Sequence, residues 1–393
     1  MKKRTIDNIA YMTLTGSIPS RKADAVCVMN MCAALAGQGA GIELVIPRGQ
    51  ASELAALNHN GTIWDFYGLA ERFPIRYLPS PFDRFGPDLK RNGYAFLALL
   101  YAAVSGKQLV NVRQIELALM AARLRMPCVF ECHNFLKVSG SGSLARFVER
   151  MNKPRCRAAI VTTTQAGRAA FIAAGVPESR IAVLPNGVPV HLYAGAPPAD
   201  ELRRLLGLPC PATIACFSGS LYPGRGIENI LCCAERFSDV CFLIVGGSPE
   251  EVERYRCAAQ EKQLTNVHLT GYVPATQVPR YLSASDMLLM PNTSASSGHA
   301  IAYTSSMKIF DYLAAGRPII ASDFPVVREI LAHGRNAVLV PPDSARALAD
   351  GVQWVLDNPG AAAGMAGQAR CDAQQFSWQK RAENYRAFVE AVL

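Results

Sequence analysis

Short apolar runs of strand length alternate with helix-length amphipathic segments along almost the whole chain, and this alternation limits the fold more than any other feature. Such a pattern is typical of a doubly wound α/β sheet, in which helices cover both faces of mostly parallel strands. In the first half, strands are predicted near residues 9–13, 42–46, 108–112, 127–132, 158–163 and 181–184. Helices are predicted between them, notably over Ala23–Gly37, Gln114–Arg125 and Gln165–Ala174.

The alternation stops after Pro185-Asn186-Gly187 and restarts beyond residue 200. The stretch that ends near Ala199 is rich in Pro, Ala and Gly and has no periodicity, which predicts an interdomain linker. Further strands are predicted near residues 213–218, 240–246, 266–270, 286–290, 318–322 and 337–340. The helices between them are predicted near residues 226–236, 250–262, 276–283, 306–315 and 344–356.

A chain of 393 residues exceeds the size at which one hydrophobic core usually keeps growing. The sequence therefore predicts two Rossmann-like domains, over residues 1–190 and 200–376, that face each other across a ligand cleft. A last helix over residues 377–393 carries Tyr385, Phe388 and Val392 at helical spacing, so one of its faces is expected to be buried.

Composition excludes several classes of protein. With 50% hydrophobic and 18% charged residues, the chain has the composition of a globular enzyme and no disordered segment is expected. Met1-Lys2-Lys3-Arg4 resembles the start of a signal peptide, but Asp7, Asn8 and Thr13 interrupt the apolar run that should follow. The longest apolar runs fall short of the ~20 residues that cross a bilayer. We therefore expect a soluble, cytoplasmic protein.

Cysteine usage favours a reducing compartment. Of the 12 cysteines, Cys27, Cys32, Cys216, Cys232, Cys233 and Cys241 lie in apolar segments, where a free thiol packs as a small hydrophobic group. Cys128, Cys132 and His133 have no second Cys/His pair at zinc-like spacing, so no metal site is predicted.

The charge is unevenly distributed. The net charge is +11 over residues 1–199 and −2 over residues 200–393. A basic first half suggests an anionic partner, either a phospholipid surface or a diphosphate-bearing lipid acceptor. A basic solvated face without a partner is the alternative.

The loop Phe217–Ile227 runs from a predicted strand into a predicted helix and is a candidate phosphate site. Gly219 and Gly226 allow the backbone to approach a ligand, Ser220 lies between them, and Arg225 stands at the helix start. A cation there is not needed to neutralise the helix dipole, so it could clamp a diphosphate. The alternative is a loop that only turns the chain.

The segment Tyr303–Gly316 is a second candidate. Ser305 and Ser306 precede an apolar helical run and leave backbone N–H groups exposed, and Lys308 lies in the first turn, where a cation is unfavourable unless an anion binds. Asp311 follows one turn later and could accept two sugar hydroxyls. The alternative is a surface ion pair between Lys308 and Asp311.

His133 follows a predicted strand in the first half, in Glu131-Cys132-His133-Asn134. It could be a hydrogen-bonded structural residue or could face the reacting sugar, and the sequence leaves both open.

Together these segments resemble the retaining glycosyltransferases of family four, which have the GT-B fold. The resemblance covers nearly the whole chain and is carried by the ordered series Glu131–His133, Val161–Thr164, Leu184–Val188, Gly219–Gly226, Gly271–Pro274, Ala284–Asp286 and Met307–Asp323. It implies that Arg225 and Lys308 hold the diphosphate of a nucleotide-sugar donor, with the backbone of Ser305 and Ser306 beside them. It also implies that the last helix crosses back to the first domain.

Other residues take roles from the same resemblance. Asp311 stands at the second carboxylate of the family's paired-Glu motif, which binds the nucleotide ribose. Tyr272 and Val273, within Gly271–Pro274, would lie along the nucleobase, and His133 resembles the cleft histidine near the donor sugar. Two positions depart from the pattern: Tyr303 replaces the first carboxylate, which puts the sugar-ring contacts in doubt, and Ser220 replaces a common arginine.

The resemblance implies transfer with retention of anomeric configuration, by front-face attack that needs no protein nucleophile. Because the sequence has no Asp-any-Asp motif, Arg225 and Lys308 are expected to do the work of a metal, and no cofactor is expected. Tyr303 beside Ser-Ser-Met-Lys resembles a branch of capsule and lipopolysaccharide transferases, which implies a glycan or lipid-linked acceptor. The basic N-terminal domain suggests peripheral contact with an anionic membrane at its inner face.

Three alternatives remain open at this point: a sugar-nucleotide epimerase of the same fold, a non-catalytic component of a polysaccharide assembly complex, and a nucleic-acid-binding protein. The last is disfavoured, because no basic stripe interleaved with aromatic residues is present. The base, the sugar and the acceptor cannot be predicted, since sugar selectivity depends on contacts around Ser296–Ile301.

Overall fold

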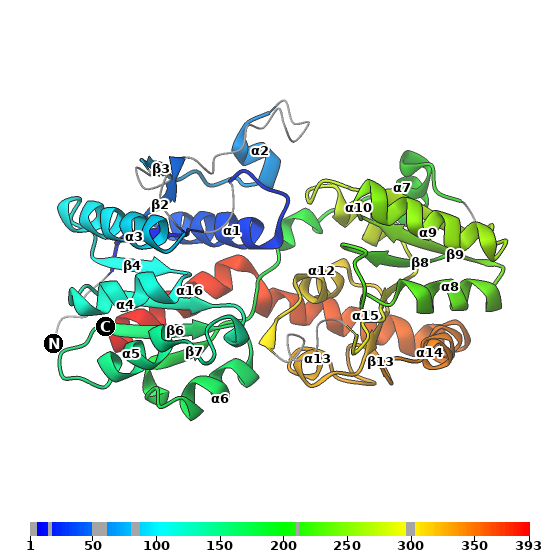
Figure 1. Ribbon diagram of the computed structural model, residues 1–393. Coiled ribbons are helices and arrows are strands. Elements are labelled where there is room, and N and C mark those ends of the chain that lie inside the picture. Colours follow the sequence, from blue (N-terminus) through cyan, green and yellow to red (C-terminus); the bar gives the residue numbers. More distant parts are fainter. Residues whose placement is uncertain (1–5, 15–17, 49–60, 80–86, 210–211, 296–302) are drawn as a thin grey trace. The chain divides into compact units, whose positions relative to one another are not determined.

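The computed structural model describes residues 6–14, 18–48, 61–79, 87–209, 212–295 and 303–393 (Figure 1). The chain forms two compact units. The first comprises Met1–Gly187, Tyr303–Ser305 and Trp378–Leu393, and the second comprises Val188–Ala302 and Ser306–Ser377. Each unit is built around one parallel sheet.

The first unit has seven strands in the order β3-β2-β1-β4-β5-β6-β7, all paired in parallel. Their bounds are Asn8–Met12 (β1), Gly41–Pro47 (β2), Ile75–Leu78 (β3), Leu109–Val112 (β4), Cys128–Cys132 (β5), Ala158–Thr162 (β6) and Ile181–Val183 (β7). The central strands are buried on both faces and are mostly apolar, with Asn111 in β4 and Glu131 in β5 as exceptions, which explains why the sequence predicts them well.

Helices cover both faces of this sheet. One face packs on α3 (Pro87–Val104), α4 (Ile115–Arg123), α5 (Gly142–Met151) and α6 (Gln165–Ala173). On the other, α1 (Ala23–Gly37) lies against α16 (Trp378–Val392), drawn in red in Figure 1. The last helix thus returns to the first unit, as expected. Shorter elements are α2 (Ile63–Tyr67), η3 (Phe135–Lys137) and η4 (Glu178–Arg180).

The second unit has six parallel strands in the order β10-β9-β8-β11-β12-β13. Their bounds are Thr213–Ser218 (β8), Val240–Val245 (β9), Val267–Gly271 (β10), Met287–Met290 (β11), Ile319–Ser322 (β12) and Val338–Val340 (β13). Together with the first sheet, this confirms the prediction of two Rossmann-like doubly wound units.

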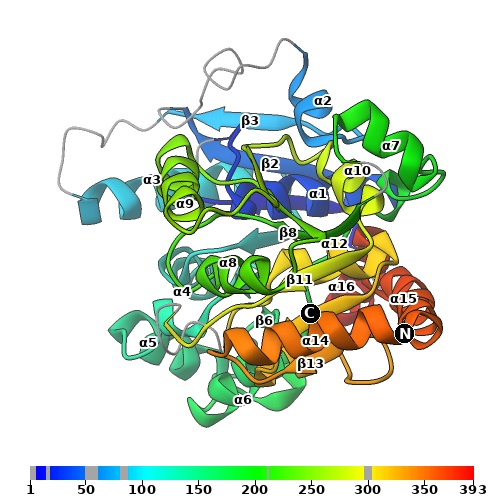
Figure 2. The same cartoon turned by 90° about the vertical axis from the view of Figure 1, so that its right-hand side faces the viewer.

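One face of the second sheet packs on α8 (Ile227–Arg236), α9 (Pro249–Glu261) and α14 (Ala345–Asp357), and α8 and α14 lie against each other (Figure 2). The other face packs on α10 (Val278–Ala284), α12 (Met307–Ala315), α13 (Pro325–Arg328) and α15 (Pro359–Ala373). The remaining elements are η5 (Val190–Leu192), α7 (Ala199–Leu206) and η6 (Gln374–Phe376).

The stretch predicted as a linker is mostly part of the second unit. Val188 and Tyr193 are buried in its core, at 1% and 4% exposure, and α7 begins at Ala199. The structure also contains elements that the sequence did not predict, namely β3, α2, α3, α5, α7, α13 and α15. β3 is a short edge strand of alternating exposure, and α15 is rich in Ala and Gly, so neither shows a strong periodic pattern.

Two further observations concern the described residues as a whole. None of their helices combines the length and the apolar composition that crossing a bilayer requires. The eleven described cysteines are all free thiols, and eight of them are buried.

Candidate functional site

Glycines at the carboxyl ends of three neighbouring strands bring the backbone of the second unit close together. Gly219, after β8, has φ 137° and donates its N–H to the Val245 carbonyl at 2.8 Å. A Cβ at Gly246, after β9, would lie 2.3 Å from the Gly219 carbonyl oxygen, and Gly246 itself donates to the carbonyl of Gly271 at 2.9 Å. Side chains are excluded here, so backbone lines this edge of the sheet.

The loop after β8 ends at Gly226, which begins α8 with φ 75°. A Cβ at this position would lie 1.8 Å from the carbonyl oxygen of Pro291, the residue that follows β11. The loop is therefore pressed against the end of the neighbouring strand, and Arg225 is held at that junction. Ser220 lies exposed within the loop.

Lys308 is buried beside this glycine edge without a partner. Its Nζ lies 3.8 Å from the centroid of the Phe217 ring and 3.2 Å from where a Cβ would stand on Gly219. Within the described part of the chain, no group forms a hydrogen bond with this nitrogen. Burial holds the pKa of Lys308 well below its usual value, and the charge of Arg225 acts in the same direction. The ion pair with Asp311, left open by the sequence, is not formed.

Arg225 is the second cation at this edge. Its guanidinium carbon lies 4.2 Å above the ring of Tyr222, and the guanidinium donates to the Tyr222 hydroxyl. Its Nε is buried and has no hydrogen-bond partner among the described residues. Burial lowers the pKa of Arg225. Two like charges with unpartnered nitrogens form an arrangement that an anion would stabilise.

α12 begins next to these cations. Ser306 is its N-cap and makes no side-chain capping bond. The positive end of the helix dipole therefore lies beside Lys308. Ser305 and Tyr303 belong to the first unit: the Ser305 carbonyl accepts from Asn186 at 2.9 Å, and the Tyr303 ring lies 5.7 Å from that of Phe135. Of these three predicted donor contacts, Ser306 belongs to the second unit, whereas Ser305 and Tyr303 belong to the first.

Asp311 lies one turn along α12 and accepts a hydrogen bond from the Tyr193 hydroxyl at 2.8 Å. Burial raises the pKa of Asp311 to about 6, although the bond from Tyr193 acts to lower it. The next residue, Tyr312, connects α12 to the sheet, because its hydroxyl accepts from the Ser218 N–H at 2.9 Å and donates to the Leu289 carbonyl at 3.1 Å.

The residues predicted to lie along a nucleobase follow β10. Tyr272 is 40% exposed, whereas Val273 is partly buried against the core that contains α12. They adjoin Gly271, whose carbonyl bonds Gly246, so they continue the same glycine edge. Residues 296–301, on which sugar selectivity was expected to depend, lie outside the described residues.

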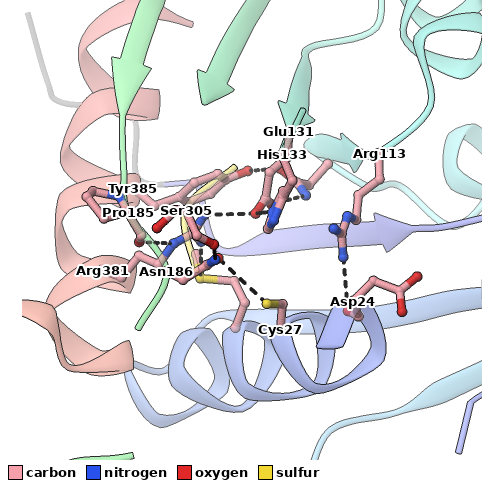
Figure 3. A network of polar contacts seen from close by, with 12 residues as sticks. Asp24, Cys27, Arg113, Glu131, His133, Pro185, Asn186, Ser305, Arg381 and Tyr385 are labelled. Carbon is pink, nitrogen blue, oxygen red and sulfur yellow. Dashed lines mark hydrogen bonds and ion pairs between the residues drawn. The ribbon is translucent and has the colours of Figure 1, made fainter. Parts of the chain in front are cut away.

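In the first unit, His133 lies just after β5 and bonds a buried carboxylate (Figure 3). Its Nε2 is 2.8 Å from Oε1 of Glu131, which is 2% exposed. Burial alone would raise the pKa of Glu131, but Arg381 and His133 hold it well below its usual range. Burial lowers the pKa of His133 to about 4, and the charge of Arg113 contributes.

These pKa values predict a pH-dependent stability. The pKa of histidine in an unfolded chain is about 6.5. Between that pH and about 4, the unfolded chain binds a proton that folded His133 does not, so the free energy of unfolding falls as the pH falls. Replacing His133 by Gln should reduce the loss between pH 7 and 4 by about 2–3 kcal/mol. Urea unfolding followed by tryptophan fluorescence measures this, and an equal loss in both proteins would contradict it.

Two residues that contact His133 or its partner, Glu131 and Arg381, were not among the predicted site residues. Glu131 interrupts the apolar run of β5 and stands two residues before His133. Residues two apart in a strand lie on the same face, so this spacing could have indicated that the two side chains interact. Arg381 gave no local signal, because it lies 250 residues away from Glu131. No cluster of three or more His, Cys, Asp or Glu side chains that could hold a metal occurs in the ranges that the structure describes.

Comparisons with known families match both units. The family described as "Glycosyl transferase 4-like domain" matches residues 25–187, and the family described as "Glycosyl transferases group 1" matches residues 212–358. The two matches together cover most of the chain.

Among curated proteins, the chain is 26% identical over 211 residues to a 2-deoxystreptamine glucosyltransferase of Streptomyces kanamyceticus, covering 52% of each chain. It is 28% identical over 221 residues to a phosphatidyl-myo-inositol mannosyltransferase of Mycobacterium tuberculosis, covering 53% of each. The matches thus span about half the length of these relatives.

Solved structures resemble the chain over its whole length. Anabaena HepE in complex with UDP has a TM-score of 0.76 at 17% identity, with 98% of this chain and 100% of that chain covered. WaaG, a glycosyltransferase involved in lipopolysaccharide biosynthesis, has a TM-score of 0.65 at 14% identity, with 97% and 99% covered. At these identities the likeness concerns the fold.

Proposed function

Because its two units match the glycosyl transferase 4-like and group 1 families and the chain has the GT-B fold, we propose that it moves a sugar from a nucleotide-diphosphate donor to a glycan or lipid-linked acceptor. One observation carries this proposal more than any other. Lys308 and Arg225 each carry a buried nitrogen without a hydrogen-bond partner among the described residues, and Lys308 Nζ lies beside Gly219 at the glycine-lined edge of the second sheet, where a diphosphate could bind.

In the proposed reaction, the bond between the anomeric carbon and the diphosphate oxygen breaks, and the acceptor oxygen bonds to the same face of that carbon. The acceptor proton passes to the departing phosphate oxygen, so no protein nucleophile is needed. The leaving diphosphate gains negative charge in the transition state. Lys308, Arg225 and the N-terminus of α12 would stabilise that charge, which is why we propose that the transfer requires no metal.

The remaining donor contacts are proposed from the resemblance of these positions to the family's motifs. Asp311 would bind the ribose, and Tyr272 and Val273 would flank the base. The neighbour HepE was crystallised with UDP and with UDP-glucose, which supports a nucleotide sugar as the donor here. The likeness to WaaG supports a role in cell-surface polysaccharide synthesis, and the free thiols support a cytoplasmic location.

A panel of nucleotide sugars tests this proposal. The correct donor should raise the melting temperature and should be consumed only when an acceptor is present, whereas epimerised donor without acceptor would identify an epimerase. Because Lys308 has a depressed pKa, binding of the donor diphosphate should also take up a proton. Titration calorimetry in buffers of different ionisation enthalpy measures this uptake. Heats that do not depend on the buffer would contradict the assignment of Lys308.

We also propose that the first unit contacts an anionic membrane. α3 carries an exposed apolar stripe at helical spacing, made of Phe96 (52% exposed), Leu100 (49%) and Val104 (81%). The net charge of +11 over residues 1–199 complements anionic lipids.

Sedimentation with phosphatidylserine vesicles tests the membrane contact. The double variant F96S/L100S should bind these vesicles several-fold more weakly than the unmodified protein. The control is Leu205→Ser, which changes a residue of the second unit that is 69% exposed and should leave binding unchanged. Equal binding to neutral vesicles would contradict the role of charge.

A further inference from the structure

The carboxylate of Glu131 is completely hydrogen-bonded although it is buried in the middle of the first sheet. Oε2 accepts from the Tyr11 hydroxyl at 2.7 Å and from Asn111 Nδ2 at 3.1 Å. Oε1 accepts from His133 Nε2 and from Arg381 Nη2, both at 2.8 Å (Figure 3). Two oxygens with four donors use every strong acceptor position of the group.

Arg381 brings the C-terminal helix α16 into this network. It is 4% exposed, and its Nε donates to the Pro185 carbonyl at 2.9 Å, which fixes the plane of the guanidinium against the chain before the second unit begins. A second residue of α16 supports the same carboxylate indirectly, because the Tyr385 hydroxyl donates to Asn111 Oδ1 at 2.9 Å. The amide of Asn111 is thereby oriented with its nitrogen toward Glu131.

This arrangement determines where the proton of His133 lies. An ionised carboxylate can only accept hydrogen bonds, so the imidazole nitrogen that faces Glu131 must carry a hydrogen. Because burial lowers the pKa of His133 to about 4, the ring is neutral at pH 7 and its other nitrogen, Nδ1, is an acceptor. No group in the described ranges bonds to Nδ1. The side chain of His133 is 19% exposed, so a hydroxyl can approach this nitrogen from outside.

We infer that Arg381 and Glu131 are positioning residues for His133, and that helix α16 keeps the imidazole neutral with its proton on Nε2 and its Nδ1 free to accept a hydrogen bond. The inference deepens the proposed function and rests on it in one respect, namely that the group bound by Nδ1 would be a hydroxyl of the donor sugar. The state of the imidazole itself requires no ligand.

The charges around the imidazole explain why Arg381 matters. The titratable groups that face Glu131 and His133 come from four elements: Tyr11 of β1, Cys27 and Cys32 of α1, Cys132 of β5, and Arg381 and Tyr385 of α16, together with Arg113 after β4. Arg381 offsets the negative charge of Glu131. Without Arg381, the carboxylate would attract a second proton to the imidazole, and imidazolium has no acceptor nitrogen.

Nuclear magnetic resonance of the protein labelled with ¹⁵N histidine tests the inference without any ligand. The spectrum of the unmodified protein should show a neutral His133 with its hydrogen on Nε2 at pH 7. In Arg381→Met, His133 should titrate at a pH higher by about one unit or more, whereas Arg381→Lys, which keeps the charge, should restore most of the original behaviour. The matched control is Arg386→Met. Arg386 also joins α16 to the first unit, by bonds to Gln38 and Asp7, but does not touch Glu131.

An unchanged titration of His133 in Arg381→Met, or the same shift in Arg386→Met, would overturn the inference. If Arg381→Met does not fold, Glu131→Gln replaces it, since an amide can donate and should let the hydrogen move to Nδ1. A Glu131→Gln protein whose hydrogen stays on Nε2 would overturn the inference equally. A shifted titration with normal transfer rates would leave the inference intact and contradict the role of His133 in the proposed function.

Discussion

Lys308→Met is expected to lower the rate of sugar transfer about 10³-fold and at the same time to stabilise the protein by about 1–2 kcal/mol. The loss arises because the buried ammonium is one of two side-chain cations facing the proposed diphosphate. The gain arises because Nζ lies buried over the Phe217 ring without a hydrogen-bond partner among the described residues, at a cost in stability. Methionine fills a similar volume and brings no unpaired polar atom.

Transfer kinetics and chemical denaturation of one preparation measure both effects. Lys262→Met is the matched control, because Lys262 is an exposed lysine of the same unit whose partner is Glu235 at the surface. Its transfer rate should be unchanged and its stability should move by no more than about 0.5 kcal/mol. Near-normal transfer by Lys308→Met would remove the central assignment of the proposed function.

Arg225→Met should lower the transfer rate about 10²- to 10³-fold, mainly through kcat, because the guanidinium would act on charge that develops as the diphosphate leaves. Arg225→Lys should recover only part of this loss. Lysine keeps the charge but lacks the planar fork that binds two phosphate oxygens and stacks on Tyr222.

The matched control for Arg225→Met is Arg236→Met, because Arg236 lies at the C-terminal end of α8, the helix that follows Arg225. Arg236 also stands over an aromatic ring, that of Phe237 at 5.3 Å, but pairs with Asp350 at the surface. Arg236→Met should therefore transfer at the normal rate. Equal losses in Arg225→Met and Arg236→Met would indicate a general effect on α8 rather than contact with the diphosphate.

The elements that the sequence predicted share strong local patterns. β8, β9 and β11 contain continuous apolar runs of four to six residues, and α8 and α14 are strongly amphipathic. A short stretch of sequence is therefore enough to predict each of them. β3 lies at the sheet edge with Arg76 among its four residues. The buried face of α15 is mostly alanine and its exposed face carries Ala and Gly, so the two faces differ little in hydropathy. These two are stabilised by tertiary packing, which a local pattern does not reveal.

The candidate site likewise contains some residues that the sequence indicates and others that only the folded structure reveals. Arg225 and Lys308 could be found in the sequence because a cation just before a helix or in its first turn is unfavourable beside the positive end of the helix dipole. The partners of other residues could not be found. Tyr193 lies 118 residues before Asp311 and Arg381 lies 250 residues after Glu131, so only the folded topology brings either pair together.

Because α16 belongs to the first unit but follows the second in the chain, the ribosome must finish the entire second unit before the first can be completed. At ordinary elongation rates, residues 188–377 alone take on the order of ten to forty seconds to synthesise. During that time one face of the nascent first sheet has α1 but lacks α16, and Glu131 lacks its arginine. A nascent chain stalled inside the second unit would therefore be exposed to chaperones and proteases with an incomplete core and an unsupported histidine.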